Sequence, residues 1–425
     1  MDKGTSDVMA RTGQVRPSLW RDRRVLGWAV GEGISSVGDQ IWLVAVAYAA
    51  VGLGSATLAG TVLACAALPR AVLMLLGGVV TDRVDARKLM LWSNIARILV
   101  LAGAIAVFEV AGTSAALLIA VGVLFGVADA FYGPASRALP RQLVSKEDLG
   151  RLAGFRQLLI RIALFGGAPL GGLLMAGYGL SAAMLADALS FGVIALVLTQ
   201  VRPRWPREKA EGKSVLSDLR GGLAYLAQTP RVRSLVIALS GLNVFASPVI
   251  VVGVALRSGQ QGWHASGLGL LTGAIGAGAG VGTVIAIFWR PVRPVRRALL
   301  LLLVQAVALG LVGFGSFAVT LAIMIVVGIT AGLASPMLAG AFQAVVGERY
   351  LGRTGAVVSI TDSGLTPFTL AGFGALAAAF GVGTVSAVFG GAFFLLILAI
   401  VAQPGTRALG RDGEPVKPRS LPADR

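Results

Sequence analysis

Long apolar stretches alternate with short polar segments along almost the whole chain. Each stretch has about 19 to 27 residues, which at ~1.5 Å per helical residue is enough to cross ~30 Å of hydrocarbon. The pattern therefore predicts an all-α membrane protein with twelve transmembrane helices. In chain order, the expected helices cover residues 25–51, 55–80, 89–110, 114–138, 153–176, 180–200, 234–256, 265–289, 298–316, 319–342, 354–379 and 382–402.

The composition supports this prediction. Only 13% of the 425 residues are charged and 56% are hydrophobic, with a mean hydropathy of +0.81. A soluble domain carries about 25% charged residues, so the composition excludes a soluble protein. The 58 glycines suit a helical membrane protein, because small residues let helix backbones approach each other closely in lipid.

The basic residues follow a topological pattern, and the formal net charge is +17. Lys and Arg concentrate in residues 1–24, in every second loop and in residues 403–425, whereas the opposite loops contain only Arg257. Basic loops stay on the cytoplasmic side of a membrane, so we predict a multi-pass inner-membrane protein with two cytoplasmic tails. The basic excess would face anionic membrane lipids, and no nucleic-acid partner is expected.

A long polar segment, residues 201–233, divides the chain into two halves. The expected six-helix bundles cover residues 25–200 and 234–402. Within the segment, the polar first part is interpreted as a linker and the second part as an amphipathic surface helix. The apolar residues at helical spacing in that helix are Leu219, Leu223 and Leu226.

An internal repeat relates the two halves. Residues 126–151 align without gaps to residues 328–353. The matched residues include a glycine, a proline and a Leu-Gly-Arg triplet, and they fall at the ends of the fourth and tenth expected helices. Two related halves around a central site are typical of secondary transporters.

Few residues are suited to catalysis or metal binding. The single cysteine, Cys65, lies in an apolar stretch, and the single histidine, His264, lies near a predicted loop. No disulfide, Ser-His-Asp site or metal cluster is therefore expected. Residues 212–214 (Gly-Lys-Ser) lack the earlier glycine of a phosphate-binding loop, since Arg207 stands there. We predict no enzyme activity, no metal and no cofactor, with a proton gradient as the energy source.

Four segments resemble the major facilitator superfamily of transporters. The segment Gly78–Lys88, GVVTDRVDARK, resembles the family's loop between helices 2 and 3. SVGDQ at 36–40 and FYGPASRALPRQLV at 131–144 are similar to the branch of the enterobactin exporter and macrolide efflux proteins. GAPLGG at 167–172 resembles the antiporter signature of helix 5, G-P-x-x-G-G, with the proline displaced by one. The resemblance implies twelve transmembrane helices in two pseudo-symmetric six-helix bundles, and a transport function.

The resemblance also implies a conformational latch in the loop between helices 2 and 3, which would hold the cytoplasmic side shut in the outward-open state. Gly78 would let helices 2 and 11 approach, and Asp82 would accept hydrogen bonds at the positive N-terminal end of helix 11. The basic residues expected to bind lipid phosphates or carboxylates are Arg83, Arg87 and Lys88. The alternative is that these charges only fix the orientation in the membrane. The loop departs from the commonest family pattern at Asp85 and Ala86. Helix 4 has no arginine before Arg137, at its end, whereas many drug antiporters carry one within this helix.

Ionisable residues inside a membrane are costly, so each is a candidate for function. Glu32 and Asp39 share one face of helix 1, because they are seven residues apart. The resemblance implies a cavity lined by helices 1, 4, 7 and 10, which makes Asp39, Glu32 and Asp129 the predicted proton carriers. The alternative for each is a structural ion pair.

Two buried pairs are predicted from depth along the helices. Glu32 and Arg161 lie at similar depth on neighbouring helices. Arg70 and Asp362 are each about ten residues from the cytoplasmic end of helices 2 and 11, so we expect them to bridge the halves in one state of the transport cycle.

The substrate cavity is expected to be amphipathic, since helices 7 and 10 contain no charged residue. Its candidate lining residues are Trp42, Phe131, Tyr132, Asn243, Phe245 and Gln343. For the aromatic residues, packing is the alternative role.

These observations predict a proton-coupled exporter of lipophilic or amphipathic small molecules, such as a drug, siderophore or secondary metabolite, working by alternating access as a monomer. The alternatives are an uncoupled facilitator, importer or lipid flippase of the same fold, or a non-transporting receptor or assembly subunit.

Overall fold

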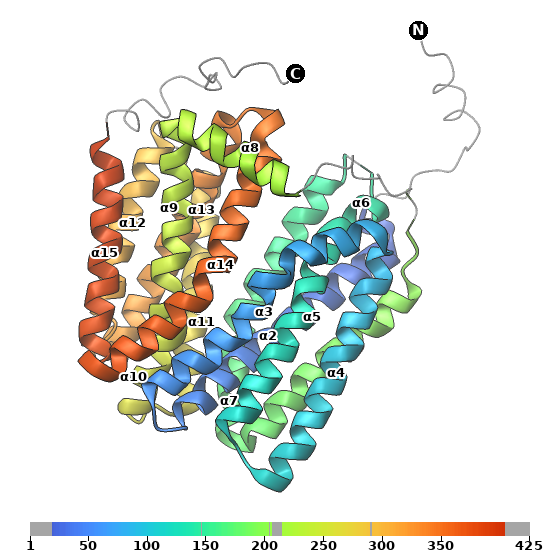
Figure 1. Cartoon of the computed structure of the whole chain (residues 1–425), viewed down its shortest axis with the longest axis vertical. Helices are drawn as coiled ribbons and strands as arrows, with labels where there is room; N and C mark the ends of the chain where they lie inside the picture. Colours follow the sequence, from blue (N-terminus) through green and yellow to red (C-terminus); the bar gives the residue numbers. More distant parts are fainter. Residues whose placement is uncertain (1–18, 146, 204, 206–214, 290, 404–425) are drawn as a thin grey trace.

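The computed structural model describes residues 19–145, 147–203, 205, 215–289 and 291–403. For residues 19, 74–76, 79, 82, 215–218, 348 and 349 it describes the backbone alone. Within these limits every regular element is a helix, and the helices form two bundles side by side (Figure 1). The predicted all-α fold is confirmed.

The first bundle begins after a short 3-10 turn, η1 (Leu19–Arg21). Its helices are α2 (Arg23–Val51), α3 (Ala56–Arg83), α4 (Ala86–Ala111), α5 (Ala115–Ala138), the short α6 (Pro140–Leu143) and α7 (Leu149–Gln200). At ~1.5 Å per residue the 52 residues of α7 would extend ~78 Å as one rod, more than twice the thickness of a bilayer core. The helix instead turns back at Gly179, whose φ is 77°, so α7 supplies the two spans predicted from the sequence.

The second bundle contains six further spans. The first is composite: α9 (Pro230–Pro248) continues through a π-helical turn, η2 (Val249–Gly253), into α10 (Val254–Gln260). The other helices are α11 (His264–Phe288), α12 (Pro294–Leu311), α13 (Phe317–Val345), α14 (Glu348–Phe380) and α15 (Val382–Ala402). Among the described residues, eleven continuous helical stretches are long and apolar enough to cross a membrane. Counting α7 twice gives the twelve spans predicted.

Short polar and glycine residues end and start the helices. Ser55 and Ser114 cap α3 and α5 by accepting bonds from backbone N–H groups at 3.4 and 3.2 Å. Such caps satisfy N–H groups that have no partner within the helix. Gly112 and Gly381 follow α4 and α14 with φ of 72° and 81°, a conformation that glycine adopts without strain. These residues explain why the predicted hairpins are tight.

The bundles touch each other toward one face of the molecule. We call the face where α2 begins and α3 ends the basic face, and the other the opposite face. A Cβ on Gly60 of α3 would lie 2.8 Å from Gly374 Cα of α14, and one on Gly269 of α11 would lie 2.9 Å from Gly172 Cα of α7. All four glycines lie near the helix ends at the opposite face. In this conformation the backbones of the two bundles therefore meet closely there.

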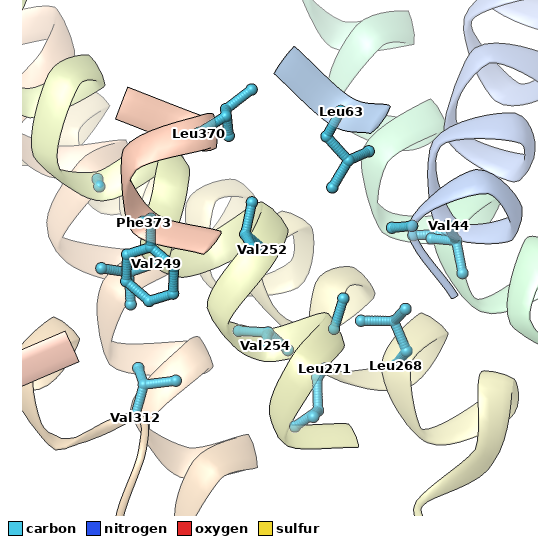
Figure 2. Packing of buried hydrophobic residues seen from close by; sticks show 14 of the residues in the cluster. Val44, Leu63, Val249, Val252, Val254, Leu268, Leu271, Val312, Leu370 and Phe373 are labelled. Carbon is cyan, nitrogen blue, oxygen red and sulfur yellow. The ribbon is translucent and has the colours of Figure 1, made fainter. Parts of the chain in front are cut away.

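An apolar cluster continues across this contact (Figure 2). Val44 and Leu63 of the first bundle and Val252, Leu268 and Phe373 of the second are all buried in it. Lipid tails are as apolar as these side chains, so close packing rather than exclusion of water holds such helices together. The glycines and the cluster thus serve the same contact.

The sequence repeat corresponds to matching helix contacts. Gly126 of α5 packs on the carbonyl of Ala66 in α3, and Gly328 of α13 packs on the carbonyl of Ile275 in α11. A side chain at either glycine would overlap that backbone. Each bundle therefore has the same close glycine–carbonyl contact between two of its helices, at the same position of the repeat.

Helix α8 (Val215–Gln228) lies at the basic face and packs on α14 of the second bundle (Figure 1). Gly222 lets it approach so closely that a Cβ there would be 2.6 Å from the carbonyl oxygen of Arg353. Tyr225 stacks on Tyr350 with ring centroids 4.3 Å apart and an interplanar angle of 12°. Leu226 is buried in the same cluster, whereas Leu223 is exposed.

Candidate transport site

A hydrogen-bonded ion pair joins three helices in the first bundle. Arg156 of α7 donates from Nε and Nη2 to the two carboxylate oxygens of Glu32 in α2, both at 2.7 Å. Ser136 of α5 donates to Glu32 and accepts from Arg156 Nη2 at 2.8 Å. The guanidinium also lies over the ring of Trp28, 5.0 Å from its centroid. A bidentate arginine–carboxylate pair of this kind fixes helix positions as well as charge.

This arrangement corrects one predicted pair. Glu32 pairs with Arg156, not with Arg161. Arg161 is half-buried, and its Nε has no hydrogen-bond partner. The two arginines are five residues apart, which at ~100° per residue places them about 140° apart around α7. The sequence predicted the depth of the Glu32 partner along α7 adequately, but not the rotation of α7 about its own axis.

A second ion pair lies deeper in the same bundle. Arg97 of α4 pairs with Asp129 of α5. Its guanidinium lies over the rings of Tyr132 and Phe191, 4.5 and 5.0 Å from their centroids. Cation–π contacts of this kind gain strength when the cation is desolvated, and Arg97 is only 2% exposed. In this conformation Asp129 therefore has a structural partner, the alternative that the sequence left open.

Two further carboxyl groups of this bundle have no salt-bridge partner among the described residues. Asp39 lies near the middle of α2, where its side chain is exposed but lies within the electrostatic reach of Arg97 and Arg70. Asp187 of α7 is completely buried, and its Oδ2 has no hydrogen-bond partner among the described side chains and backbone. The helices approach closely here, since a Cβ on Gly38 would be 2.5 Å from Asp187 Oδ1. Asp39 and Asp187 are therefore neighbours with different access to solvent.

The second bundle contributes one carboxyl group at mid-depth. Asp362 of α14 accepts a 2.9 Å hydrogen bond from Asn243 Nδ2 of α9, and the Ser240 hydroxyl of the same helix lies beside its carboxyl group. Within the described part of the chain, Asp362 has no salt bridge, to Arg70 or to any other cation. The predicted bridge between Arg70 and Asp362 is absent from this conformation and stays a prediction for another state.

The predicted cavity residues divide into two groups. Trp42 and Phe245 pack in the apolar interior, with ring centroids 5.7 Å from Phe125 and 5.9 Å from Phe393 respectively. Asn243 and Gln343 are exposed. Phe131 is half-buried, and Tyr132 stacks on Arg97 with a buried hydroxyl that has no hydrogen-bond partner. The structure does not bring these six residues together as one lining.

The loop between α3 and α4 makes its contacts inside the first bundle. Arg87 donates to the carbonyl oxygens of Leu198 and Thr199 at 2.6 and 2.9 Å, so it binds the C-terminal end of α7, where the helix dipole is negative. Asp85 caps α4 by accepting from the N–H of Arg87 at 2.8 Å. The unusual residue of the family-like loop therefore has a structural role as an N-cap.

The rest of the predicted latch makes no contact with α14 that the structure describes. A Cβ on Gly78 would meet nothing within 4 Å, so this glycine does not mediate a close approach of α3 and α14 here. Arg83 and Lys88 are exposed. The side chain of Asp82 lies outside the described side chains. The close contact of these helices is at Gly60 and the opposite face instead, so the latch role of Gly78 stays a prediction for the outward-open state.

Sequence reasoning missed part of the network, although its signal is present in the sequence. Asp129, Tyr132 and Ser136 follow each other at i, i+3 and i+7, the spacing of one helix face. The predicted pairs did not include Arg156. A search for polar residues at helical spacing around each buried acid would have found Ser136.

The geometry is that of a two-bundle membrane protein with ionisable groups at its centre, and the family comparison agrees. The model described as Major Facilitator Superfamily matches residues 29–366. The chain belongs to the major facilitator superfamily. It is therefore a transporter-type membrane protein by family and fold.

Curated relatives of this superfamily member are distant. It is 25% identical over 244 residues to the uncharacterized MFS-type transporter YkuC of Bacillus subtilis, and the aligned region covers 52% of this chain and 54% of that protein. It is 27% identical over 222 residues to macrolide efflux protein A of Streptococcus pyogenes, covering 49% of this chain and 54% of that protein. The chain thus spans about half the length of the curated relatives it matches.

Solved structures of the superfamily share the fold. A D-xylose–proton symporter matches with a TM-score of 0.72 at 15% identity, covering 92% of this chain and 99% of that one. The nucleoside transporter NupG matches with a TM-score of 0.68 at 15% identity, with 89% and 98% covered. A bacterial homologue of the iron transporter ferroportin in an inward-facing state matches with a TM-score of 0.63 at 17% identity, with 90% and 99% covered. At these identities the likeness shows the fold alone.

Proposed function

We propose that this superfamily member is a proton-coupled exporter of lipophilic or amphipathic small molecules. The observation that carries the proposal is the pair of mid-depth carboxyl groups, Asp39 and Asp187, without a cationic partner among the described residues. Glu32 and Asp129 are neutralised by arginines, so their charge is fixed. A carboxyl group without such a partner in a membrane is costly as an anion and can exchange its charge for a proton.

Asp39 is the proposed proton carrier because its side chain is exposed, whereas that of Asp187 is not. It lies 16 residues from the start of α2, about 24 Å along the helix at ~1.5 Å per residue, and its side chain is exposed. Asp187 lies behind it, completely buried. Binding of a proton at Asp39 removes a negative charge from the neighbourhood of Asp187, so the two groups would titrate together.

The conformation supports alternating access. The bundles meet closely at the opposite face, and we propose that the basic face is cytoplasmic, from the positive-inside pattern of the sequence. The structure would then be open toward the cytoplasm, the state in which an exporter collects its substrate. The resemblance to a macrolide efflux protein favours export of an apolar or amphipathic solute. A proton gradient, a small-molecule substrate and surrounding lipids are the only partners this function needs.

The test is transport by the purified protein in proteoliposomes with an imposed pH gradient. Candidate amphipathic compounds should move against their gradient only when the proton gradient is present. Asp39→Asn should abolish this dependence. Glu109→Gln is the matched control, because Glu109 is also a membrane-segment acid but bonds Ser181 at 2.5 Å near the opposite face.

Each outcome decides between mechanisms. Transport at equal rates with and without a gradient would identify an uncoupled facilitator or flippase and refute proton coupling. Retention of coupling in Asp39→Asn would exclude Asp39 as the carrier. Equal loss in Glu109→Gln would show that the loss reflects general damage to the protein.

A further inference from the structure

A cavity of about 620 Å³ lies at the turn between α11 and α12. Gly269, near the start of α11, lies at the opposite face, so α11 ends and α12 begins at the basic face. None of the described residues that line the cavity is acidic. Three arginines line it together with apolar side chains, and the set includes Arg293, Arg296, Arg297, Trp289, Val292 and Leu300. The cavity therefore combines a concentrated positive charge with apolar surface.

The three arginines have no counter-charge among the described residues. All are exposed, and none takes part in a described salt bridge. Arg296 and Arg297 lie in the first turn of α12, at the positive end of the helix dipole, where a cation is unfavourable. The N-cap is Arg293, whose side chain makes no cap hydrogen bond, since a guanidinium has no acceptor atom. Positive charge from the side chains and from the helix end therefore accumulates here.

The corresponding turn of the first bundle satisfies its polar groups within the protein. Like α12, α4 is the third span of its bundle, and its N-cap is Asp85, which accepts from the N–H of Arg87 at 2.8 Å. The Arg87 side chain binds carbonyl oxygens at the end of α7. The second bundle instead places Arg293 at the cap position. The difference indicates that the partner of the turn between α11 and α12 is an anion from outside the chain.

The apolar part of the cavity distinguishes a lipid from a free anion. Phe288, Val292 and Leu300 are exposed beside the arginines. Leu300 lies about 9 Å along α12 from its first residue, at ~1.5 Å per residue, which places it at the depth of acyl chains when the arginines lie among headgroups. Trp289, at the end of α11, is the residue type that lies at headgroup level. A soluble phosphate compound would use the arginines alone, whereas a phospholipid uses both parts.

We propose that this cavity binds the phosphate headgroup of an anionic phospholipid from the leaflet at the basic face. The guanidinium groups donate paired hydrogen bonds to the phosphate oxygens, and the acyl chains lie along the exposed apolar side chains of α11 and α12. Basic pockets between transmembrane helices recognise acidic headgroups in this way. The inference goes beyond the proposed transport function and depends neither on proton coupling nor on the transported molecule.

The test is native mass spectrometry of the purified full-length protein, titrated in detergent with one lipid at a time. The probes are dioleoyl phosphatidylglycerol, which is anionic, and dioleoyl phosphatidylcholine, which has the same acyl chains and no net charge. The competitor is glycerol 3-phosphate, an anionic headgroup without acyl chains. We expect the anionic lipid to bind more tightly than the neutral one and to resist displacement by the competitor. Changing Arg293, Arg296 and Arg297 together to Gln should weaken its tightest site at least about tenfold, since each arginine beside an anionic lipid contributes roughly fivefold.

The basic face offers a matched control. Arg21, Arg23 and Arg24 are exposed and follow a tryptophan, as the arginines of the cavity do, but Asp22 lies among them and caps α2 by accepting from the N–H of Arg24 at 3.1 Å. Changing these three arginines to Gln removes the same charge and should leave the tightest site unchanged. Size-exclusion profiles and thermal transitions establish that the variants are folded. The single change Arg297→Gln should weaken binding roughly fivefold and replaces the triple variant if that variant does not fold.

Four results would overturn the inference. Unchanged affinity for phosphatidylglycerol in the cavity variants would exclude the arginines. An equal loss in the control variant would mean that the basic face attracts acidic lipids without a specific site. Equal affinity for phosphatidylcholine would remove the role of the headgroup charge, and displacement by glycerol 3-phosphate would identify a site for a soluble phosphate compound. Failure of the pH-gradient experiment would refute proton coupling and leave lipid binding standing.

Discussion

Removal of Arg156 should destabilise the first bundle strongly, because it would leave Glu32 without its cation. The Glu32 carboxylate accepts two 2.7 Å bonds from the guanidinium, and the two side chains are 11% and 19% exposed. At an effective dielectric constant of ~20, unit charges ~4 Å apart attract by about 4 kcal/mol. Breaking one partner of a buried pair costs about 3 to 5 kcal/mol. We expect Arg156→Gln to lose roughly 3 kcal/mol of unfolding free energy.

Neutralising both partners should cost much less than the sum of the single changes. Glu32→Gln alone leaves Arg156 unpaired, whereas the double variant removes both charges and keeps two groups that can hydrogen-bond each other. The expected coupling energy is about 1.5 to 3 kcal/mol, since hydrogen bonds to charged groups have this strength. Reversible unfolding by SDS in mixed micelles, followed by circular dichroism, measures all four free energies.

The control is the exposed pair of Arg151 and Asp148, whose closest atoms are 3.3 Å apart, with Arg151 69% exposed. Exposed pairs contribute about 0 to 1 kcal/mol, so Arg151→Gln should have little effect. Additive losses for Glu32 and Arg156 would refute the argument, because they would mean that the two side chains act independently. An equal loss in Arg151→Gln would show that any arginine at this end of α7 matters.

Three further predictions concern helix contacts. Gly38→Ala should lower the unfolding free energy by about 1 to 3 kcal/mol through overpacking, because its Cβ would lie 2.5 Å from a buried carboxylate of α7. Gly27→Ala on the same helix has open space and should not lower it. Equal SDS unfolding curves for both variants would contradict this prediction. Gly60→Val should push α14 away from α3 and depopulate the present conformation, whereas Gly78→Val should be tolerated in this conformation. Pulsed EPR distances between labels on α6 and α12 measure the change. Unchanged distances in Gly60→Val would contradict the prediction. Burial raises the pKa of Tyr225, so docking of α8 should be complete below pH ~10 and lost as the pH rises further. In Tyr225→Phe, α8 should remain docked. Limited proteolysis of α8 across pH measures docking, and identical pH profiles of the variant and the unaltered protein would exclude the tyrosine as the cause.

The sequence predicted the spans well because lipid imposes a simple length requirement. The two spans of α7 were also predicted correctly. No polar interruption separates them, because a glycine such as Gly179 can reverse the chain. The π-helical turn at Val249–Gly253 was not predicted, because five apolar residues carry no signal of an altered helical register. Apolar periodicity locates helices in a membrane but says little about their local winding.

The partners of buried charges were harder to predict than the charges themselves. Residue counting placed Glu32 at the depth of Arg161, but which of Arg156 and Arg161 faces it depends on how α7 is rotated. That rotation is set by tight contacts such as Gly171 on the backbone of Ile41, where a Cβ would be 2.7 Å from the Ile41 Cα. The predicted role of Gly78 belongs to another state, since a sequence motif serves all states of a transport cycle and the structure shows one.

The internal pairing of Glu32 with Arg156 and of Asp129 with Arg97 has an electrical consequence. These four charges move together with the first bundle, so they cancel and the membrane potential exerts little net force on them. Voltage acts on a transport cycle at about 2.3 kcal/mol per elementary charge per 100 mV. Exchange of one proton at Asp39 for one monovalent cationic solute would carry no net charge, so the membrane potential would not drive such a cycle. Exchange of a proton for a neutral molecule would move one charge and produce a measurable current.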